Sequence, residues 1–391
     1  MNAVGGEQLS GRGSSEPGSP SSASARVEIA LAIDWEVPLE SRYRLTPHAS
    51  ALADPSIDVA DLAPIAAVPP SHVEQARTRL ESADDKLVET LRQAESAGAR
   101  LVPYSSPDYP QGLRDLELPP PCLFVRGHAP LDVLQTPAIG VVGPRNADPY
   151  GLEVTRHLAG ELSRAGLVIG SGFARGVDAA AHREAAENGN PTLAWLGCGV
   201  DVAYPRQNQR LIEPVLQSGG LLVSEFPFGT TPAAWRFPLR NRLIAASTVG
   251  MLVTQASLRS GSLISARLAL ELGREVYAVP GRIFDARSRG TNLLLRDGAH
   301  VALNADSILD TLPLHVQEEL QRVREGAPGE GAFAQDLRRL FSSSDRSWSA
   351  DEIGQTLGVE DVGTILSALS ELELDGWIVR SPGGGFERRQ P

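Results

Sequence analysis

The sequence predicts an α/β fold whose core is a doubly wound parallel sheet, and three observations support this prediction. Over residues 139–303, short apolar and β-branched runs alternate with helical stretches. Each run is continuously apolar, which is typical of strands buried on both faces of a parallel sheet. Loops rich in Gly, Ser and Arg follow the runs, most clearly within residues 167–189. Such a glycine-rich turn before a helix can hold phosphate with backbone N–H groups.

The predicted sheet domain covers residues 84–312. Its first helix ends at Gly98, and strands are expected at residues 101–104, 122–125, 138–142, 167–169, 192–196, 221–223, 251–254, 276–279 and 300–303. This alternation is that of an extended Rossmann-like sheet, in which ligands bind at the carboxyl ends of the strands. Small and basic residues fall at those ends: Gly143, Arg145, Gly170, Ser171, Gly172, Gly197, Gly199, Ser224 and Ser257.

Two segments precede the sheet domain. Residues 1–25 are rich in Gly, Ser and Pro and contain no apolar signal-peptide core, so we expect a disordered tail. Residues 26–83 carry short helical signals, including a Ser-x-x-Glu capping box at residues 71–74 that should open a helix. We interpret residues 26–83 as a small helical module that packs on the sheet domain or docks a partner.

A linker and a winged-helix domain are predicted after the sheet domain. The linker, residues 313–333, mixes charge, Gly and Pro. The winged-helix domain, residues 334–391, should contain a helix near residues 335–340, a capping box at residues 349–352, a helix closed by Gly358, a helix at residues 361–374, and strands at residues 377–380 and Phe386.

Winged helices commonly bind duplex DNA, but the charge of this one argues against that use. From Gln335 onward, 6 Arg stand against 10 Asp and Glu, and the helix that would read the groove has no basic residue. Phosphate contacts supply most of the affinity for DNA. We therefore favour protein docking over DNA reading for this domain.

The charge of the chain is unevenly distributed. The formal net charge is −12, yet residues 138–310 contain 17 Arg and no Lys against 15 Asp and Glu. The planar fork of arginine fits phosphate and stacks on bases, although a high genomic GC content would also enrich Arg over Lys. No apolar run approaches a membrane span, and Cys122 and Cys198 lie in apolar runs. We expect a cytoplasmic protein without a membrane segment, a disulfide or a metal site.

The sequence lacks the familiar nucleotide-binding and catalytic motifs. Lys86 is the only lysine and follows no glycine run, which excludes a Walker-type P-loop. In the glycine loop at residues 170–176, the third glycine comes one position too late for a dinucleotide fingerprint. Asp178 and His182 share a helix face, and we favour a helix-start cap and a structural histidine over a catalytic pair. We therefore expect neither catalysis nor a cofactor.

Seven sequence blocks, in order, carry a specific resemblance to one protein family. They are VVGPRNADPYG (141–151), SGFARGVDAAAH (171–182), LGCGVDVAYPRQN (196–208), SEFPFGTTP (224–232), FPLRNRLIA (237–245), SLRSGSLISARLALELGREVYAVPG (257–281) and GTNLLLRDGA (290–299). On these blocks the chain resembles the bacterial DNA-processing protein A family, DprA or Smf. The resemblance is strong over residues 84–310, and the flanking modules match the family architecture in outline.

The resemblance implies a role in handling DNA. Members of the family bind single-stranded DNA that enters the cell and load the RecA recombinase onto it, as dimers, during natural transformation. The implied partners are single-stranded DNA, RecA and a second copy of the chain, with the single-stranded DNA-binding protein as a candidate. Phe173, Tyr204 or Phe237 would stack on bases, with Tyr204 and Phe237 equally well explained as core residues.

The resemblance also assigns phosphate contacts residue by residue. Arg145 would pair with a phosphate, the glycine loop would offer N–H donors, and further arginines would extend the groove. The residues assigned to DNA or phosphate binding are Gly143, Arg145, Ser171, Gly172, Phe173, Ala174, Arg175, Gly176, Arg206, Asn208, Arg240, Asn241, Arg242, Ser260, Gly261 and Ser262.

Three features depart from the family pattern, and two other functions stay open. Pro144 stands where Ser or Thr is usual, Gln255 stands where Glu is usual, and the helical module lacks a clear helix-hairpin-helix signature. The first alternative is a phosphoribohydrolase of the lysine-decarboxylase-like superfamily, but residues 280–283 lack the second glycine of its P-G-G-x-G-T loop. The second is a protein-interaction scaffold, which predicts no affinity for oligonucleotides.

Overall fold

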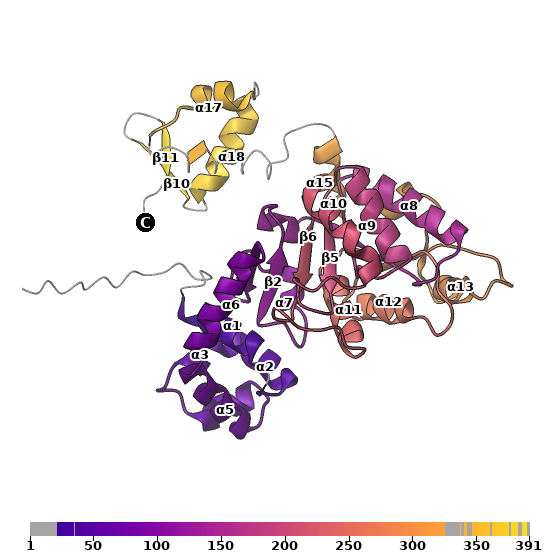
Figure 1. The fold of residues 1–391 in the computed structure, drawn as a ribbon. Helices are drawn as coiled ribbons and strands as arrows, with labels where there is room; N and C mark the ends of the chain where they lie inside the picture. The colour runs from indigo at the N-terminus through magenta and orange to yellow at the C-terminus, as the bar shows by residue number, and fades with distance from the viewer. Residues whose placement is uncertain are drawn as a thin grey trace, which may run out of the picture. The chain divides into compact units, whose positions relative to one another are not determined.

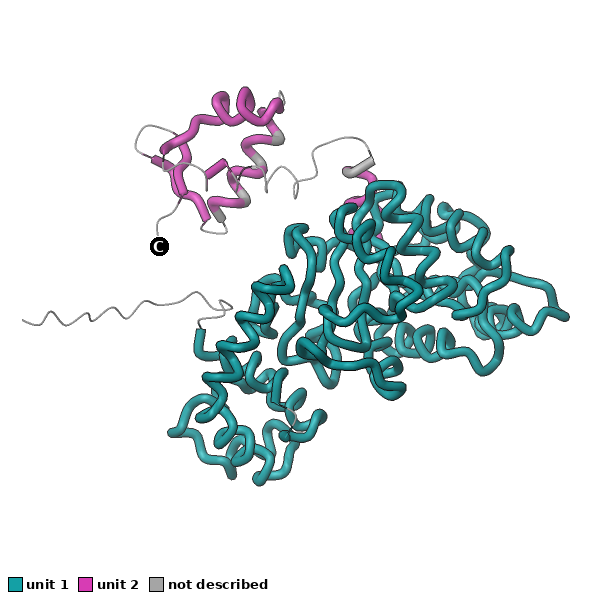
Figure 2. Tube along the Cα trace, viewed as in Figure 1, with its two compact units in different colours: residues 1–313 teal, residues 314–391 magenta. Residues whose placement is uncertain are grey.

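The computed structural model describes residues 22–34 and 36–324 and, nearer the C-terminus, residues 337, 340–341, 346–359, 362–374, 377–381 and 385–388. The chain divides into two compact units, residues 1–313 and 314–391, which Figure 2 colours teal and magenta. Within the described residues, no helix is both long and apolar enough to cross a membrane.

Short helices form the N-terminal module, as the sequence predicts. They are α1 (Ala23–Ile33), α2 (Leu39–Leu45), the 3-10 helix η1 (Thr46–His48), α3 (Ala49–Ala53), α4 (Val59–Ile65) and α5 (Pro70–Glu81). Helix α6 (Asp84–Ser96) is the predicted first helix of the sheet domain. Helix α1 begins inside the predicted tail, because the Ser22 side chain accepts a hydrogen bond from the Ala25 N–H (3.2 Å) and caps it. The rest of the tail, residues 1–21, lies outside the described residues.

The predicted capping box at residues 71–74 is wrong. Helix α5 begins one residue earlier, at Pro70, with Pro69 at the N-cap and no side-chain cap. Proline suits the first helical position because it has no N–H group to leave unpaired there. Ser71 therefore lies inside the first turn and cannot act as the cap.

A single nine-stranded sheet forms the core of the first unit, in the order β1-β2-β6-β5-β4-β3-β7-β8-β9. Its strands are β1 (Ala99–Pro103), β2 (Cys122–Arg126), β3 (Ala138–Val142), β4 (Val168–Ser171), β5 (Thr192–Leu196), β6 (Leu221–Ser224), β7 (Gly250–Val253), β8 (Glu275–Ala278) and β9 (His300–Val301). The strands from β6 to β9 are parallel, as predicted. Strands β1 and β2 pair antiparallel, as do β2 and β6. The connection from β1 to β2, residues 104–121, contains one short helix, the four-residue α7 (Gln111–Arg114).

Helices cover both faces of the sheet (Figure 1). Helices α8 (Pro149–Arg164), α9 (Val177–Glu187) and α10 (Ile212–Gln217) lie on one face, and α11 (Arg236–Ala246) and α12 (Gly261–Glu271) lie on the other. The remaining helices of this unit are the 3-10 helices η2 (Leu131–Leu134) and η3 (Arg206–Leu211), and α13 (Arg289–Arg296) and α14 (Asp306–Leu309).

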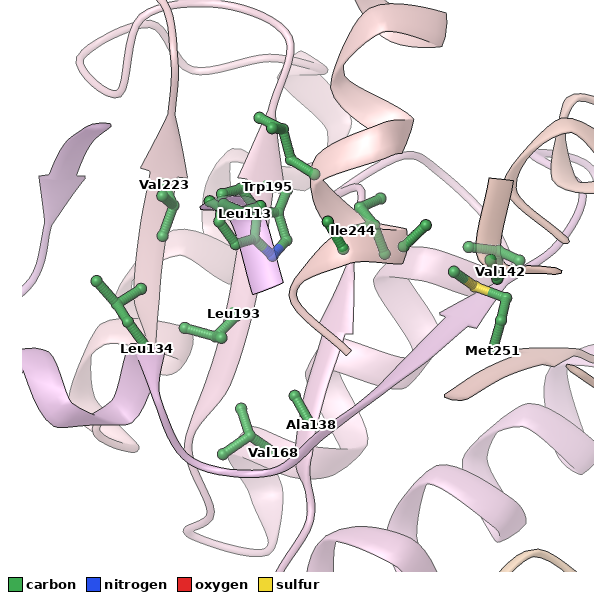
Figure 3. Close-up of a cluster of buried hydrophobic side chains, with 14 of the residues drawn as sticks. Leu113, Leu134, Ala138, Val142, Val168, Leu193, Trp195, Val223, Ile244 and Met251 are labelled. Carbon is green, nitrogen blue, oxygen red and sulfur yellow. The ribbon is translucent and has the colours of Figure 1, made fainter. Parts of the chain in front are cut away.

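Alternate side chains of β2, β5 and β6 enter different core clusters. Leu193 and Trp195 of β5 pack with Val223 and with Ile244 of α11, as Figure 3 shows. Their neighbours in the strand, Ala194 and Leu196, belong to the cluster on the opposite face. Both faces of the strands are therefore buried, which accounts for the continuous apolar runs in the sequence.

The strand order reverses direction at β3. The chain runs outward from β3 through β4 and β5 to β6, then returns to place β7 on the other side of β3. The loops that follow β3 and β7 consequently diverge and leave a crevice at the carboxyl edge of the sheet. A crevice at such a reversal is where doubly wound folds bind ligands.

A buried ionic cluster joins the helical module to the sheet domain. The Tyr43 hydroxyl of α2 and the Arg242 guanidinium of α11 both donate to Oε2 of Glu225, whose side chain is completely buried. The Arg242 guanidinium also lies over the Tyr43 ring, 5.2 Å from its centroid. Burial raises the pKa of Tyr43 well above its usual value, so the phenol keeps its proton and acts as a donor.

The second unit contains α15 (Leu314–Arg324), α17 (Ala350–Leu357), α18 (Val362–Leu374), β10 (Ile378–Arg380) and β11 (Phe386–Arg388). Helix α15 occupies the first half of the predicted linker, which is therefore helical and not irregular. Residues 325–333 of the linker lie outside the described residues. The predicted capping box at Ser349 and Glu352 is confirmed, and Gly358 ends α17 in the left-handed conformation. Most of the predicted helix at residues 335–340 lies outside the described residues.

Candidate functional site

Two adjoining cavities lie at the carboxyl edge of the sheet. The larger, of about 620 Å³, is lined by the loops after β3 and β7 and by α11. The smaller, of about 430 Å³, is lined by the loops after β4 and β5. Five residues line both cavities, which makes them one continuous site: Arg145, Ala174, Tyr204, Phe237 and Arg240.

A stacked aromatic pair stands between the two cavities. The rings of Tyr204 and Phe237 are 5.5 Å apart between centroids and inclined by 27°. The Arg145 guanidinium lies over the Phe237 ring, 5.5 Å from its centroid. Both aromatic side chains are half-buried, with a remaining surface that faces the cavities. The pair therefore contributes both to packing and to the cavity wall.

Three exposed arginines border the cavities without a protein partner. Within the described residues, Arg145, Arg175 and Arg206 form no ion pair and no side-chain hydrogen bond, and all three are exposed. Each guanidinium keeps its five N–H donors available for an anion. The structure thus brings together three of the predicted phosphate-binding arginines.

Two of the N–H donors predicted in the glycine loop after β4 are engaged within the protein. The carboxylate of Asp178, in the first turn of α9, accepts hydrogen bonds from the N–H groups of Gly172 (3.1 Å) and Ala174 (3.3 Å). Burial raises the pKa of Asp178, an effect that Arg240 and these two N–H groups oppose. An internal carboxylate therefore occupies the donors expected to bind phosphate. Asp178 is structural, as interpreted from the sequence, but it is not a helix cap: Gly176 is the N-cap of α9, and Asp178 binds the loop before the helix.

Arg240 holds the loops together instead of presenting its charge to a ligand. Its side chain is buried and donates hydrogen bonds to the carbonyl oxygens of Gly172 (2.6 Å) and Trp195. Burial lowers the pKa of Arg240 to about 10, although Asp178 raises it. Arg240 ties the β4 and β5 loops to α11, and the cavities depend on it for their shape.

Four other predicted contact residues prove to be structural. Arg242 points away from the cavities to Glu225 and Tyr43. Ser171 donates to the Val141 carbonyl (2.6 Å), and Asn208 donates to the carbonyls of Phe173 (2.8 Å) and Ala174 (3.0 Å). Phe173 is only 2% exposed and packs on the His182 ring, so it cannot stack on a base.

Predicted residues also line the walls of the larger cavity: Gly143, Asn241, Ser260, Gly261 and Ser262. Ser260 caps α12 by accepting from the Ser262 N–H (3.3 Å). Gly176 lies at the start of α9 with φ of 79°, where a side chain would collide with the Pro144 carbonyl oxygen. Gly176 shapes the loop without lining either cavity.

A carboxylate that the sequence analysis missed anchors the rim of the site. Asp148 caps α8 through the Gly151 N–H (2.8 Å) and accepts from Nε2 of Gln255 (2.9 Å) and from Arg287 (3.2 Å). It thereby connects the loops after β3, β7 and β8. An Asp before a Pro at a helix start signals the cap, but the two distant partners leave no signal in the sequence.

His182 is a buried structural histidine, as interpreted from the sequence. Its Nδ1 lies 2.7 Å from the Thr192 hydroxyl, which donates to the Ile169 carbonyl. The hydroxyl proton is thus engaged, so Nδ1 carries the hydrogen of a neutral ring. Burial, followed by the charge of Arg240, lowers the pKa of His182 to about 3.

Acid should destabilise the protein through His182. The folded pKa lies below the usual histidine value of 6.5, so stability is complete above pH 6.5 and is lost as the pH falls towards 3. Between pH 7.5 and 5.5 this histidine should cost about 1.4 kcal/mol of unfolding free energy. Urea denaturation at both pH values should show a smaller loss for His182→Gln than for the unaltered chain. Equal losses would contradict the assignment.

Neither cysteine lies at a metal site. Cys122 and Cys198 are both buried and free, and the described part of the chain holds no group of three or more His, Cys, Asp or Glu side chains arranged for a metal.

Comparison with known proteins places this site in a family. Residues 100–313 match the model of DNA recombination-mediator protein A, and residues 337–384 match the DprA winged helix domain. Protein Smf of Escherichia coli K12 is 36% identical over 81% of this chain and 85% of its own length. DNA processing protein DprA of Bacillus subtilis 168 is 38% identical over 61% of this chain and 79% of its own length.

A solved structure agrees with the fold. The X-ray structure of DNA processing protein A from Streptococcus pneumoniae aligns with a TM-score of 0.64 and 29% identity, over 75% of this chain and 99% of that one. The match of the family model extends over more than half of the residues, and it includes every strand of the sheet from β2 to β9. The chain belongs to the DNA recombination-mediator protein A family.

Proposed function

We propose that this protein binds single-stranded DNA along the two cavities and helps to load RecA onto it during natural transformation and recombination. The observation that carries the proposal is the stacked pair of Tyr204 and Phe237 beneath the Arg145 guanidinium. Aromatic faces take up bases, and unpaired arginines take up phosphates. The site supplies both side by side.

The shape of the site favours a single strand over a duplex. The aromatic pair lies between concave cavities, which a base can enter only if it is free of its partner strand. Exposed arginines line the smaller cavity beside the pair, at Arg145, Arg175 and Arg206. Several consecutive phosphates of a strand could pair with these three arginines, whereas the phosphate of one mononucleotide could not pair with all of them.

The proposal extends to the partners of the protein. Membership of a recombination-mediator family supports RecA as the protein that receives the DNA. The proposal further includes a homodimer that acts in the cytoplasm and catalyses no reaction. The single-stranded DNA-binding protein is a candidate partner, since it would coat the same strand. For the winged-helix domain we keep protein docking as the proposed role, given its excess of acidic residues.

Arg145→Ala should weaken binding of single strands and reduce its salt dependence. Each lost phosphate contact should make the slope of log affinity against log salt shallower by about 0.7. Fluorescence anisotropy with a labelled oligonucleotide and with its duplex, at several salt concentrations, measures both quantities. Arg156→Ala, a change on the α8 surface outside both cavities, is the matched control and should leave the slope unchanged. Equal affinity for duplex and single strand, or release of free base from a nucleoside monophosphate, would contradict the proposal.

A further inference from the structure

We propose that the loop between β8 and α13, residues 279–288, is a second base-stacking platform for the single strand, with Phe284 as its aromatic face. The inference rests on the proposed function and extends its site across the crevice. No residue of this loop lines either cavity. Residues 282–289 belong to none of the seven sequence blocks that resemble the family.

Phe284 is the most exposed large apolar side chain among the described residues. It is 90% exposed, and its neighbour Ile283 is 72% exposed. Two adjacent apolar side chains at this exposure contribute almost nothing to a core. A side chain that does not stabilise the fold is available to a ligand.

The loop that carries Phe284 is held in place by its own hydrogen bonds. Asn292 of α13 binds both the N–H (3.1 Å) and the carbonyl (3.0 Å) of Gly281. The Asp285 carboxylate accepts from the Arg287 N–H (2.9 Å), and the Ser288 N–H donates to the Asp285 carbonyl (3.1 Å). The platform is therefore preorganised, and ordering it on binding should cost little.

The loop adjoins the candidate site directly. It follows a parallel strand, so it lies at the same carboxyl edge as the cavities. The Ala256 N–H donates to the Arg287 carbonyl, and the Gly290 N–H donates to the Ala256 carbonyl, each at 2.7 Å. Ala256 precedes the segment that lines the larger cavity at Ser260. Asp148, three residues after Arg145, pairs with the Arg287 side chain.

The charge around Phe284 suits a phosphate backbone. Arg282 lies in the loop and Arg289 directly follows it; both are exposed, and neither forms an ion pair within the described part of the chain. Within residues 279–288 the only acidic side chain is Asp285, which the loop itself engages. An aromatic ring among unpaired arginines, continuous with a proposed DNA site, matches single-stranded DNA. An apolar protein partner would instead leave these arginines buried without counter-charges.

The test compares oligonucleotides of two lengths on the full chain. A short thymidine oligomer is chosen to fill the cavities only, and a longer one reaches beyond them. Phe284→Ala should lower the affinity for the long oligomer roughly tenfold and leave that for the short oligomer unchanged. The salt slope should not change, because phenylalanine carries no charge. Phe284→Trp should restore the affinity for the long oligomer.

Ile65→Ala, which removes a 67% exposed apolar side chain from α4, is the matched control and should alter neither affinity. If the unaltered chain binds neither oligomer, the proposed function fails. If the unaltered chain binds both oligomers and Phe284→Ala has the same affinity for the long oligomer as the unaltered chain, only the proposed platform is overturned. Equal loss for both lengths would likewise overturn it, since the loop would then act through the cavities.

Discussion

Glu225→Ala is expected to lower the unfolding free energy of the unit formed by residues 1–313 by about 3–5 kcal/mol. The Glu225 side chain is completely buried, and that of Arg242 is 11% exposed. Removing the carboxylate leaves the Arg242 charge without its partner and the Tyr43 hydroxyl without its acceptor. The penalty is large because a buried charge regains no hydration when its partner is lost.

Urea denaturation followed by tryptophan fluorescence measures the loss. The matched control is Glu117→Ala, which removes the exposed ion pair with Arg44 at the same junction (2.8 Å) and should cost less than about 1 kcal/mol. In the double variant Glu225→Ala/Arg242→Ala, the combined loss should be smaller than the sum of the two single losses. A Glu225→Ala effect no larger than the control would mean that water reaches the cluster.

The strands were predictable because burial on both faces leaves a local signature. Each parallel strand reads as a largely apolar run, and the observed bounds differ from the prediction by at most two residues. The antiparallel pairing of β2 with β1 and β6 leaves no such signature, since β2 is an apolar run up to Arg126, much like the parallel strands. Which neighbour a strand pairs with depends on the chain path and not on its composition.

The candidate site was predictable as a location but not residue by residue. Arg240 and Arg242 stand two positions apart in one sequence block, and the sequence analysis placed both in the groove. On a helix, two positions correspond to a rotation of about 200°. Arg240 accordingly faces the strand-end loops, and Arg242 faces Glu225 and Tyr43, which lie far away in the sequence.

The glycine loop illustrates a competition that sequence cannot resolve. Its N–H groups could donate to a ligand phosphate or to the carboxylate at the start of the next helix. Both have the same charge and the same preference for a helix N-terminus. In the folded chain Asp178 occupies the N–H groups of Gly172 and Ala174. Under the proposed function, phosphate binding is therefore left to side chains, chiefly those of Arg145, Arg175 and Arg206.

Phe237→Ala is expected to weaken binding of single-stranded DNA by about 1–3 kcal/mol, which is roughly 5- to 150-fold in dissociation constant. The substitution removes a ring that lines both cavities and also removes the surface over which Arg145 lies. Phe237→Trp should keep most of the affinity, because a larger ring still stacks. Anisotropy with a single-stranded oligonucleotide at fixed salt measures each effect.

Phe228→Ala is the matched control for Phe237→Ala. Phe228 is also half-buried at the carboxyl edge, but its ring meets Phe124 edge-on and lines neither cavity. Its loss should leave the affinity unchanged. Arg145→Ala and Phe237→Ala should combine to less than the sum of their effects, because the guanidinium is positioned by the ring. Unchanged affinity in Phe237→Ala would assign this ring to the core alone and leave binding to the arginines.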